Sequence, residues 1–105
     1  MLFRSLRFAV DGATLQIDLT STKVFLNGSV VCLTSTEYTL LVMLAQEPRP
    51  VKIQHVIEML YGVNVRKNLL NNICVFIYRI RRAIGPGFVR NDKDGTYQMI
   101  GRVEA

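Results

Sequence analysis

The sequence predicts an α+β fold in which a four-stranded antiparallel sheet precedes three helices and a C-terminal β-hairpin. Three observations predict it. Apolar residues alternate with a period of two up to residue 33, which is typical of strands. From residue 34 the apolar period becomes helical. After Gly85-Pro86-Gly87, two short β-prone runs flank a turn that contains Gly95, which is typical of a hairpin.

The composition is that of a globular chain. Of its 105 residues, 50% are hydrophobic and 20% are charged, which excludes a disordered protein. We expect a single domain over 1–105, with the sheet in 1–33, the helices in 34–85 and the hairpin in 88–101. No apolar run has the length of a membrane span, and the N-terminus lacks the apolar core of an export signal.

The expected strands are joined by tight turns. The alternating apolar positions of the first two strands are Leu6, Phe8 and Val10, then Leu15, Ile17 and Leu19. Asp11-Gly12 is a turn signal between them. Asn27-Gly28 separates the runs 22–26 and 29–33 and is the strongest two-residue hairpin signal, because both turn positions need positive φ.

A helix start follows the last strand. Thr34 and Glu37 have the spacing of a capping box, in which each side chain accepts from the other residue's backbone N–H. Leu33 and Tyr38 occupy the two positions of a hydrophobic staple. We expect this helix to end before Pro48, because proline cannot continue it.

Two more helices are expected downstream. The second runs over about 52–61, with Gly62 just past its end. A loop over 63–67 leads to the third and longest helix, 68–84. Its apolar stripe is Leu69, Ile73, Ile77, Ile80 and Ile84. These large aliphatic side chains are costly to expose, so this side of the helix must face the core.

Positive charge is concentrated in the C-terminal part of the chain. Residues 1–62 carry five basic and five acidic side chains, whereas residues 63–105 carry eight basic and three acidic ones. No acid lies between Glu58 and Asp92. This asymmetry is typical of a protein that binds a polyanion, most simply nucleic acid.

The face of the third helix opposite its apolar stripe carries groups that can contact DNA. They are Asn71, Asn72, Val75, Phe76, Tyr78, Arg79 and Arg82, with Arg81 on a flank. Asn pairs bidentately with adenine, Arg with guanine, and an apolar group contacts the thymine methyl. Further cations lie before the helix and in the hairpin: Arg66, Lys67, Arg90 and Lys93. The alternatives are an ordinary solvated face, first-turn asparagines without a binding role, and aromatic side chains that pack against the hairpin.

Other chemistry is poorly supported. The single histidine, His55, has no nucleophile near it in the sequence, so we expect neither an enzyme nor a catalytic residue. Cys32 and Cys74 lack the spacing of metal ligands, and we interpret them as reduced, buried thiols of a cytoplasmic protein. No phosphate-binding loop or calcium loop occurs, and no metal or cofactor is expected.

Four segments carry a family resemblance that extends over about 6–100. Residues 33–41 are similar to LTxxEFxLL, and residues 50–62 resemble VVSREELLxxVWG. Residues 75–84 are similar to VHIxRLRRKL, and residues 89–97 resemble TVRGxGYxL. In this order and spacing they resemble the DNA-binding effector domain of OmpR/PhoB-type response regulators of bacterial two-component systems, a winged helix-turn-helix.

The resemblance implies a recognition helix in the major groove and a wing, the C-terminal hairpin, at the adjacent minor groove. On the matched positions, the base-facing residues are Asn72, Val75, Phe76 and Arg79, and the phosphate contacts are Arg81, Arg82 and Arg90. The loop 62–67 lies where the family meets RNA polymerase. Cys74 and Phe76 replace the acid and histidine of the family motif, Lys52 replaces its cap serine, and the wing is longer.

The resulting hypothesis is a cytoplasmic, sequence-specific regulator of transcription that binds double-stranded DNA, with a homodimer expected on paired half-sites. The family's phosphorylated receiver domain is absent from these residues, so a regulatory domain is expected outside them or regulation differs. The alternative is a protein-interaction module that uses the same helix face. An RNA-binding role is weaker, because no RNP-like aromatic strand occurs.

Overall fold

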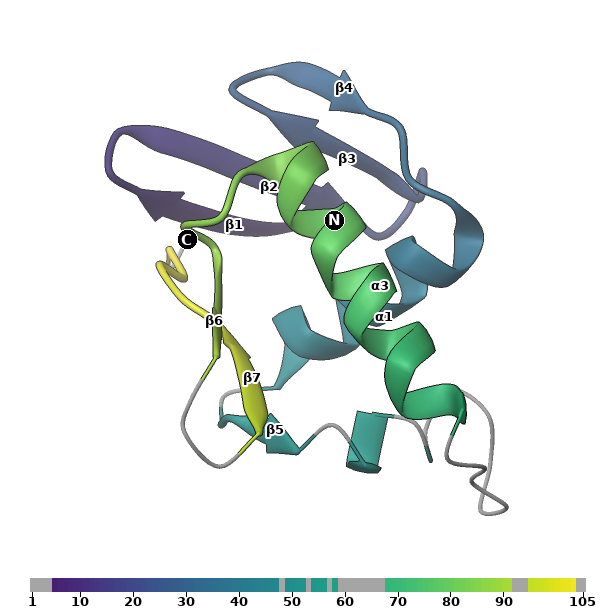
Figure 1. The fold of residues 1–105 in the computed structure, drawn as a ribbon. Coiled ribbons are helices and arrows are strands. Elements are labelled where there is room, and N and C mark those ends of the chain that lie inside the picture. The colour runs from purple at the N-terminus through teal and green to yellow at the C-terminus, as the bar shows by residue number, and fades with distance from the viewer. Residues whose placement is uncertain are drawn as a thin grey trace.

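The computed structural model describes residues 5–47, 49–52, 54–56, 58, 68–91 and 95–103, and for 68–72 the backbone alone. The elements in chain order are β1 (Ser5–Val10), β2 (Ala13–Asp18), β3 (Lys23–Leu26), β4 (Ser29–Val31), α1 (Ser35–Gln46), β5 (Val51–Lys52), α3 (Asn68–Ile84), β6 (Val89–Asn91) and β7 (Thr96–Met99). In Figure 1 the β1–β4 sheet lies at one end, and α3 extends from it past the hairpin β6–β7.

The N-terminal sheet confirms the prediction. Its order is β1-β2-β3-β4, and each neighbouring pair is antiparallel. Asn27 (φ 51°) and Gly28 (φ 85°) both adopt positive φ in the turn between β3 and β4. The Asn27 side chain also accepts a hydrogen bond from the Thr14 backbone N–H at 2.9 Å, which ties this turn to β2.

The second sheet contains a strand that the sequence pattern did not reveal. β5 pairs with β7, so the order is β5-β7-β6, and Lys52 lies opposite Thr96. Lys52 was expected to begin the second helix and instead belongs to this strand. Residues 54–56 and 58 are helical, and the rest of the expected helix over 52–61 lies outside the described residues. A two-residue strand has no periodicity of its own, so only its partner defines it.

The core forms where α1 and α3 meet both sheets. Four of the five residues in the predicted apolar stripe of α3 face inward: Ile73, Ile77, Ile80 and Ile84 are each at most 2% exposed. The fifth, Leu69, has its side chain outside the described residues. The four isoleucines pack with buried residues of the N-terminal sheet, α1 and the hairpin. The boundaries of α3 match the expected 68–84, and the helix is anchored from Ile73 to Ile84, so its opposite face is displayed on a fixed support.

The first helix begins with the predicted capping box. The Glu37 N–H donates to Thr34 Oγ1 at 3.2 Å, and the Thr34 N–H donates to Glu37 Oε1 at 3.0 Å. Glu37 is the buried charged residue among those described, and both hydrogen bonds of the capping box join it to Thr34. The helix ends at Gln46, before Pro48, as expected.

Replacement of the cap should weaken α1. We expect Thr34→Ala to lower the free energy of unfolding by about 1 kcal/mol, because the Glu37 N–H loses its acceptor. Urea titration followed by circular dichroism measures the change. Thr39→Ala is the control, since Thr39 is exposed and its hydroxyl only donates back to the Ser35 carbonyl. Equal losses in the two variants would contradict a specific role of the cap.

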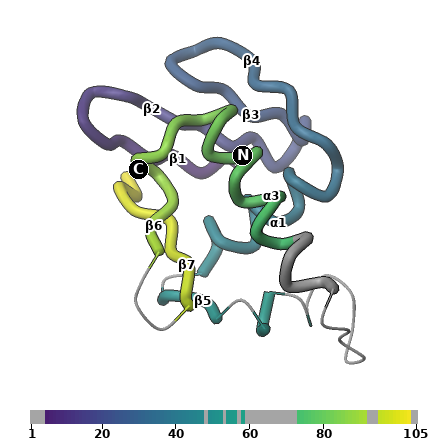
Figure 2. The backbone as a smooth tube through the Cα atoms, viewed as in Figure 1, coloured from purple at the N-terminus to yellow at the C-terminus, as the bar shows by residue number. Residues whose placement is uncertain are grey.

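The end of the described chain returns to the N-terminal sheet (Figure 2). The Ala9 N–H donates to the Gly101 carbonyl at 2.7 Å, and the Val103 N–H donates to the Arg7 carbonyl at 2.9 Å. Phe8 and Arg102 form an antiparallel bridge between these bonds. The segment after β7 thus extends the sheet beyond β1, and it joins the hairpin to the N-terminal sheet.

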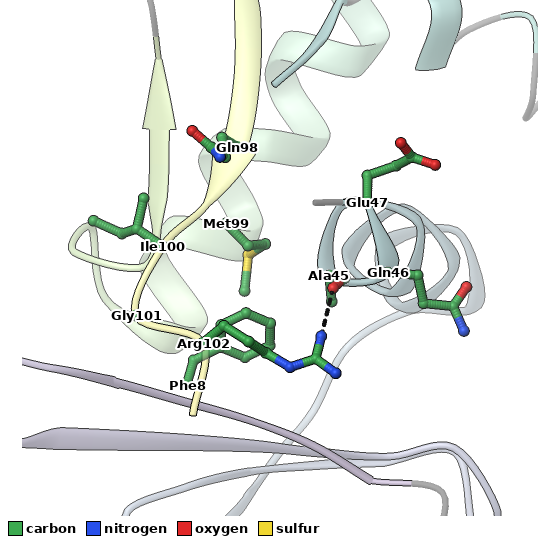
Figure 3. Close-up of a pocket in the computed structure, with 9 residues that line it drawn as sticks. All are labelled: Phe8, Ala45, Gln46, Glu47, Gln98, Met99, Ile100, Gly101 and Arg102. Carbon is green, nitrogen blue, oxygen red and sulfur yellow. Dashed lines mark hydrogen bonds between the residues drawn. The ribbon is translucent and has the colours of Figure 1, made fainter. Parts of the chain in front are cut away.

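Arg102 joins this segment to α1. Its Nη1 donates to the Ala45 carbonyl at 3.1 Å, and its guanidinium lies 5.7 Å from the centre of the Phe8 ring. The last turn of α1 carries no basic residue, so Arg102 supplies a cation to the negative end of the helix dipole. An open pocket of about 600 Å³ surrounds these contacts (Figure 3). Its other lining residues are Gln46, Glu47, Gln98, Met99, Ile100 and Gly101.

Both cysteines are free, but the prediction that they are buried is wrong. Cys32 and Cys74 are both exposed. Cys32 follows β4, the edge strand of its sheet. Cys74 directly follows the buried Ile73, and one step along a helix turns the side chain by about 100° away from the core. In the part of the chain that the structure describes, no helix is long and apolar enough to span a membrane.

Candidate nucleic-acid interface

The exposed face of α3 is a continuous stripe of four side chains, Val75, Tyr78, Arg79 and Arg82. Their spacing of i, i+3, i+4 and i+7 places them on one side of the helix, opposite the buried isoleucines. Val75 is 45% exposed and Tyr78 is 59% exposed, so both apolar groups of the stripe face solvent. This set, the exposed stripe of α3, combines two arginines with two apolar groups and has no acid.

Within the stripe, Arg82 and Tyr78 contact each other. The Arg82 guanidinium lies 5.9 Å from the centre of the Tyr78 ring. A cation over an aromatic ring gains about 0.5–1 kcal/mol at exposed sites. The contact therefore restrains both side chains on the outer surface of α3 without neutralising the charge of Arg82.

Phe76 lies beside the stripe. It is half-buried and packs against the core, as does Ala83 seven residues later on the same flank. Of the two aromatic residues that the sequence placed on this face, Tyr78 is thus the one that is presented to solvent. The larger part of Phe76 has a packing role, and its remaining surface borders the exposed stripe.

The opposite flank of α3 faces the hairpin. Arg81 Nη2 donates to the Val89 carbonyl at 3.1 Å and also to Asn91 Oδ1. Arg81 is half-buried, unlike its exposed neighbours Arg79 and Arg82. The guanidinium that the sequence assigned to phosphate therefore lies against β6.

A second contact joins the same flank to β7. Cys74 Sγ lies 4.0 Å from the Tyr97 hydroxyl, and Tyr97 is 7% exposed. Burial raises the pKa of the Tyr97 phenol above 10.0, and the neighbouring Cys74 thiol raises it further. Arg81 and a hydrogen bond with Asn91 act in the opposite direction on this pKa.

The raised pKa of Tyr97 predicts a loss of stability in alkaline solution. The folded protein keeps the phenol neutral, so its contribution is complete below pH 10.0 and decreases as the pH rises toward the folded-state pKa. We expect Tyr97→Phe to make the free energy of unfolding less dependent on pH above that value. Urea titrations on both sides of it measure the slope, and identical slopes for the two proteins would contradict the prediction.

The architecture has known counterparts. No protein-family model and no curated protein sequence matches the chain. The C-terminal effector domain of BfmR from Acinetobacter baumannii, however, is 30% identical, with 94% of each chain covered and a TM-score of 0.69. The response regulator DrrB from Thermotoga maritima, described as an OmpR/PhoB homologue, is 25% identical over 90% of this chain with a TM-score of 0.71. The chain belongs to the OmpR/PhoB family of response-regulator effector domains.

The effector domain spans 44% of the length of DrrB. It also has the fold of the RstA DNA-binding domain from Klebsiella pneumoniae, solved in complex with the RstA box. That structure gives a TM-score of 0.77 at 20% identity and covers 93% of this chain and 98% of the other. The predicted winged helix-turn-helix architecture is thus confirmed. The hairpin β6–β7 is its wing.

The remaining candidate residues of the effector domain are only partly described. Arg90 is exposed on β6 of the wing. Asn71 and Asn72 lie in the backbone of α3, but their side chains are outside the described residues. Arg66, Lys67 and Lys93 also lie outside them, as does the loop 62–67. Within the described part, no cluster of His, Cys, Asp or Glu side chains could hold a metal ion.

Sequence reasoning missed the residues that attach the wing to α3, namely Asn91 and Tyr97. One signal could have indicated the attachment. Cys74 and Arg81 are seven residues apart, so they lie two turns apart on one flank of the helix, midway between the buried and exposed faces. A polar flank of this kind favours contact with a neighbouring element, although it does not identify the element.

Proposed function

We propose that the effector domain binds a specific sequence of double-stranded DNA and thereby regulates transcription. One observation supports this most strongly: α3 is anchored by a fully buried face and presents two arginines and two apolar groups, without an acid, on the other. In the proposed complex α3 enters the major groove and the wing lies near the minor groove. The RstA domain, which shares this fold, was solved bound to its RstA box.

The residue types of the stripe suit base edges and phosphates. An arginine such as Arg79 can bind guanine bidentately, and Val75 can contact a thymine methyl. Each good bidentate pair discriminates against a wrong base by about 1–3 kcal/mol. Arg82, held at the side of Tyr78, and Arg90 on the wing are the proposed phosphate contacts. Asn71 and Asn72 complete the proposed base-reading set.

In vitro selection tests the proposal. The domain is incubated with random duplexes, and the bound fraction is amplified and sequenced over several rounds. We expect an enriched motif, and about six phosphate contacts would give a slope of log K against log salt concentration of roughly −5. Paired half-sites would indicate a homodimer on DNA, since one recognition helix reads few bases. Binding that is equal on all duplexes would contradict sequence-specific recognition.

A second candidate function uses the same surface. Exposed Tyr78 and Val75 could anchor a protein partner, because aromatic residues dominate the energy of many interfaces. Contact with RNA polymerase through 62–67 would be a separate interaction next to α3. Loss of the two exposed arginines distinguishes DNA binding from binding through apolar anchors, because only the first depends on their charge.

A further inference from the structure

We propose that Arg81 is a positioning residue that fixes the wing against α3, and that it does not itself contact phosphate. The inference rests on the proposed function, because the orientation of the wing matters for a helix and hairpin that bind DNA together. In this role Arg81 sets the angle between α3 and the hairpin β6–β7.

The contacts of Arg81 are to the wing. Its Nη2 donates to the backbone carbonyl of Val89, the first residue of β6, and to the side-chain oxygen of Asn91, the last residue of β6. A single nitrogen of Arg81 thus contacts both the first and the last residue of β6. A hydrogen bond from a charged donor is about twice as strong as a neutral one, and half-burial strengthens it further.

The attachment continues across the wing. The Asn91 side chain also hydrogen-bonds the Tyr97 phenol on β7, and Cys74 lies beside that phenol. Asn91 and Tyr97 are register partners in the β6–β7 ladder. The flank of α3 therefore contacts both wing strands, because Arg81 donates to β6 and Cys74 lies beside Tyr97 on β7.

The geometry separates Arg81 from its neighbours. Arg79 and Arg82 belong to the exposed stripe, and Arg82 remains exposed while it contacts Tyr78. Arg81 Nη2 is engaged by the Val89 carbonyl and by Asn91, and these contacts hold the guanidinium against β6, off the exposed stripe. Drawing this nitrogen onto a phosphate would release β6, which carries the exposed Arg90.

Hydrogen exchange without DNA tests the attachment directly. We expect Arg81→Ala to accelerate amide exchange in β6 and β7 by about tenfold or more, while β1–β4 remain unchanged. Arg82→Ala is the matched control and should leave wing exchange unchanged. Because Arg81→Ala could reduce folding overall, Asn91→Ala removes the acceptor from an exposed position, and it should accelerate exchange in the same two strands.

A double-mutant cycle on the selected duplex tests the consequence for binding. We expect the losses from Arg81→Ala and Asn91→Ala to be non-additive by at least about threefold in Kd, because one hydrogen bond joins them. Arg82→Ala and Asn91→Ala should combine additively. The proposal would be overturned if the losses in Kd from Arg81→Ala and Asn91→Ala were additive. It would also be overturned if neither substitution changed the rate of amide exchange in β6 and β7. If the unmodified domain binds no duplex, the proposed function fails, whereas the exchange measurement still decides whether Arg81 holds the wing.

Discussion

Gly101→Ala is expected to destabilise the effector domain by about 3 kcal/mol or more, which would lower Tm by about 10–20 °C. Gly101 has φ +84°, a conformation that L side chains rarely adopt. A Cβ there would also lie 2.5 Å from the Ala9 carbonyl oxygen and 2.6 Å from Val10 Cγ2. The first atom belongs to the backbone of β1 and cannot rotate away, so the chain would have to move.

That movement would break the junction between the wing and the N-terminal sheet. The Gly101 carbonyl accepts the Ala9 N–H, and the next residue, Arg102, reaches the end of α1. Gly12→Ala is a matched control, because Gly12 has φ +83° and nothing lies within 4 Å of its added Cβ. Thermal unfolding of both variants separates the cost of the backbone conformation from the cost of the collision. Equal Tm values would show that the collision relaxes at no cost.

The comparison of these glycines also shows what the sequence can predict. Gly12 and Gly28 lie in local turns between alternating runs, so local chemistry predicted the turns and the sheet. The capping box and the buried isoleucines of α3 were predictable for the same reason, since each depends on residues close in sequence. Gly101 follows the wing without any turn signal, and its requirement arises from Ala9, which is 92 positions away in the chain.

The same distinction applies to the candidate site. The exposed stripe was predictable, because helical periodicity separates Arg79 and Arg82 from the core. Arg81 lies between these faces, where periodicity leaves its environment open. Its partners Val89 and Asn91 follow the Gly85–Gly87 turn, whose path decides which flank of α3 the wing covers. β5 was missed for a similar reason, since its pairing with β7 joins residues that are distant in sequence.

The largest expected effect on binding comes from the double substitution Arg79→Ala, Arg82→Ala. We expect Kd for the selected duplex to rise by about 100-fold or more, because one bidentate base contact is worth about 1–3 kcal/mol and a phosphate contact is lost with it. The slope of log K against log salt concentration should become shallower by about one for each phosphate contact removed. Both arginines are exposed, so the free energy of unfolding should change little. Fluorescence anisotropy at several salt concentrations measures Kd and the slope.

The control for net charge is the double substitution Arg7→Ala, Lys23→Ala. Both residues are exposed on the N-terminal sheet, and their loss lowers the net charge by the same amount. If α3 reads the groove, this control should weaken binding only through the general field, by much less than the α3 variant, and should preserve the selected motif. Equal losses would mean that overall charge and not the exposed stripe binds the duplex.

The same variants test the alternative function, in which the apolar groups of the stripe anchor a protein partner. The interaction module would be favoured if the α3 variant still bound such a partner and Tyr78→Ala did not.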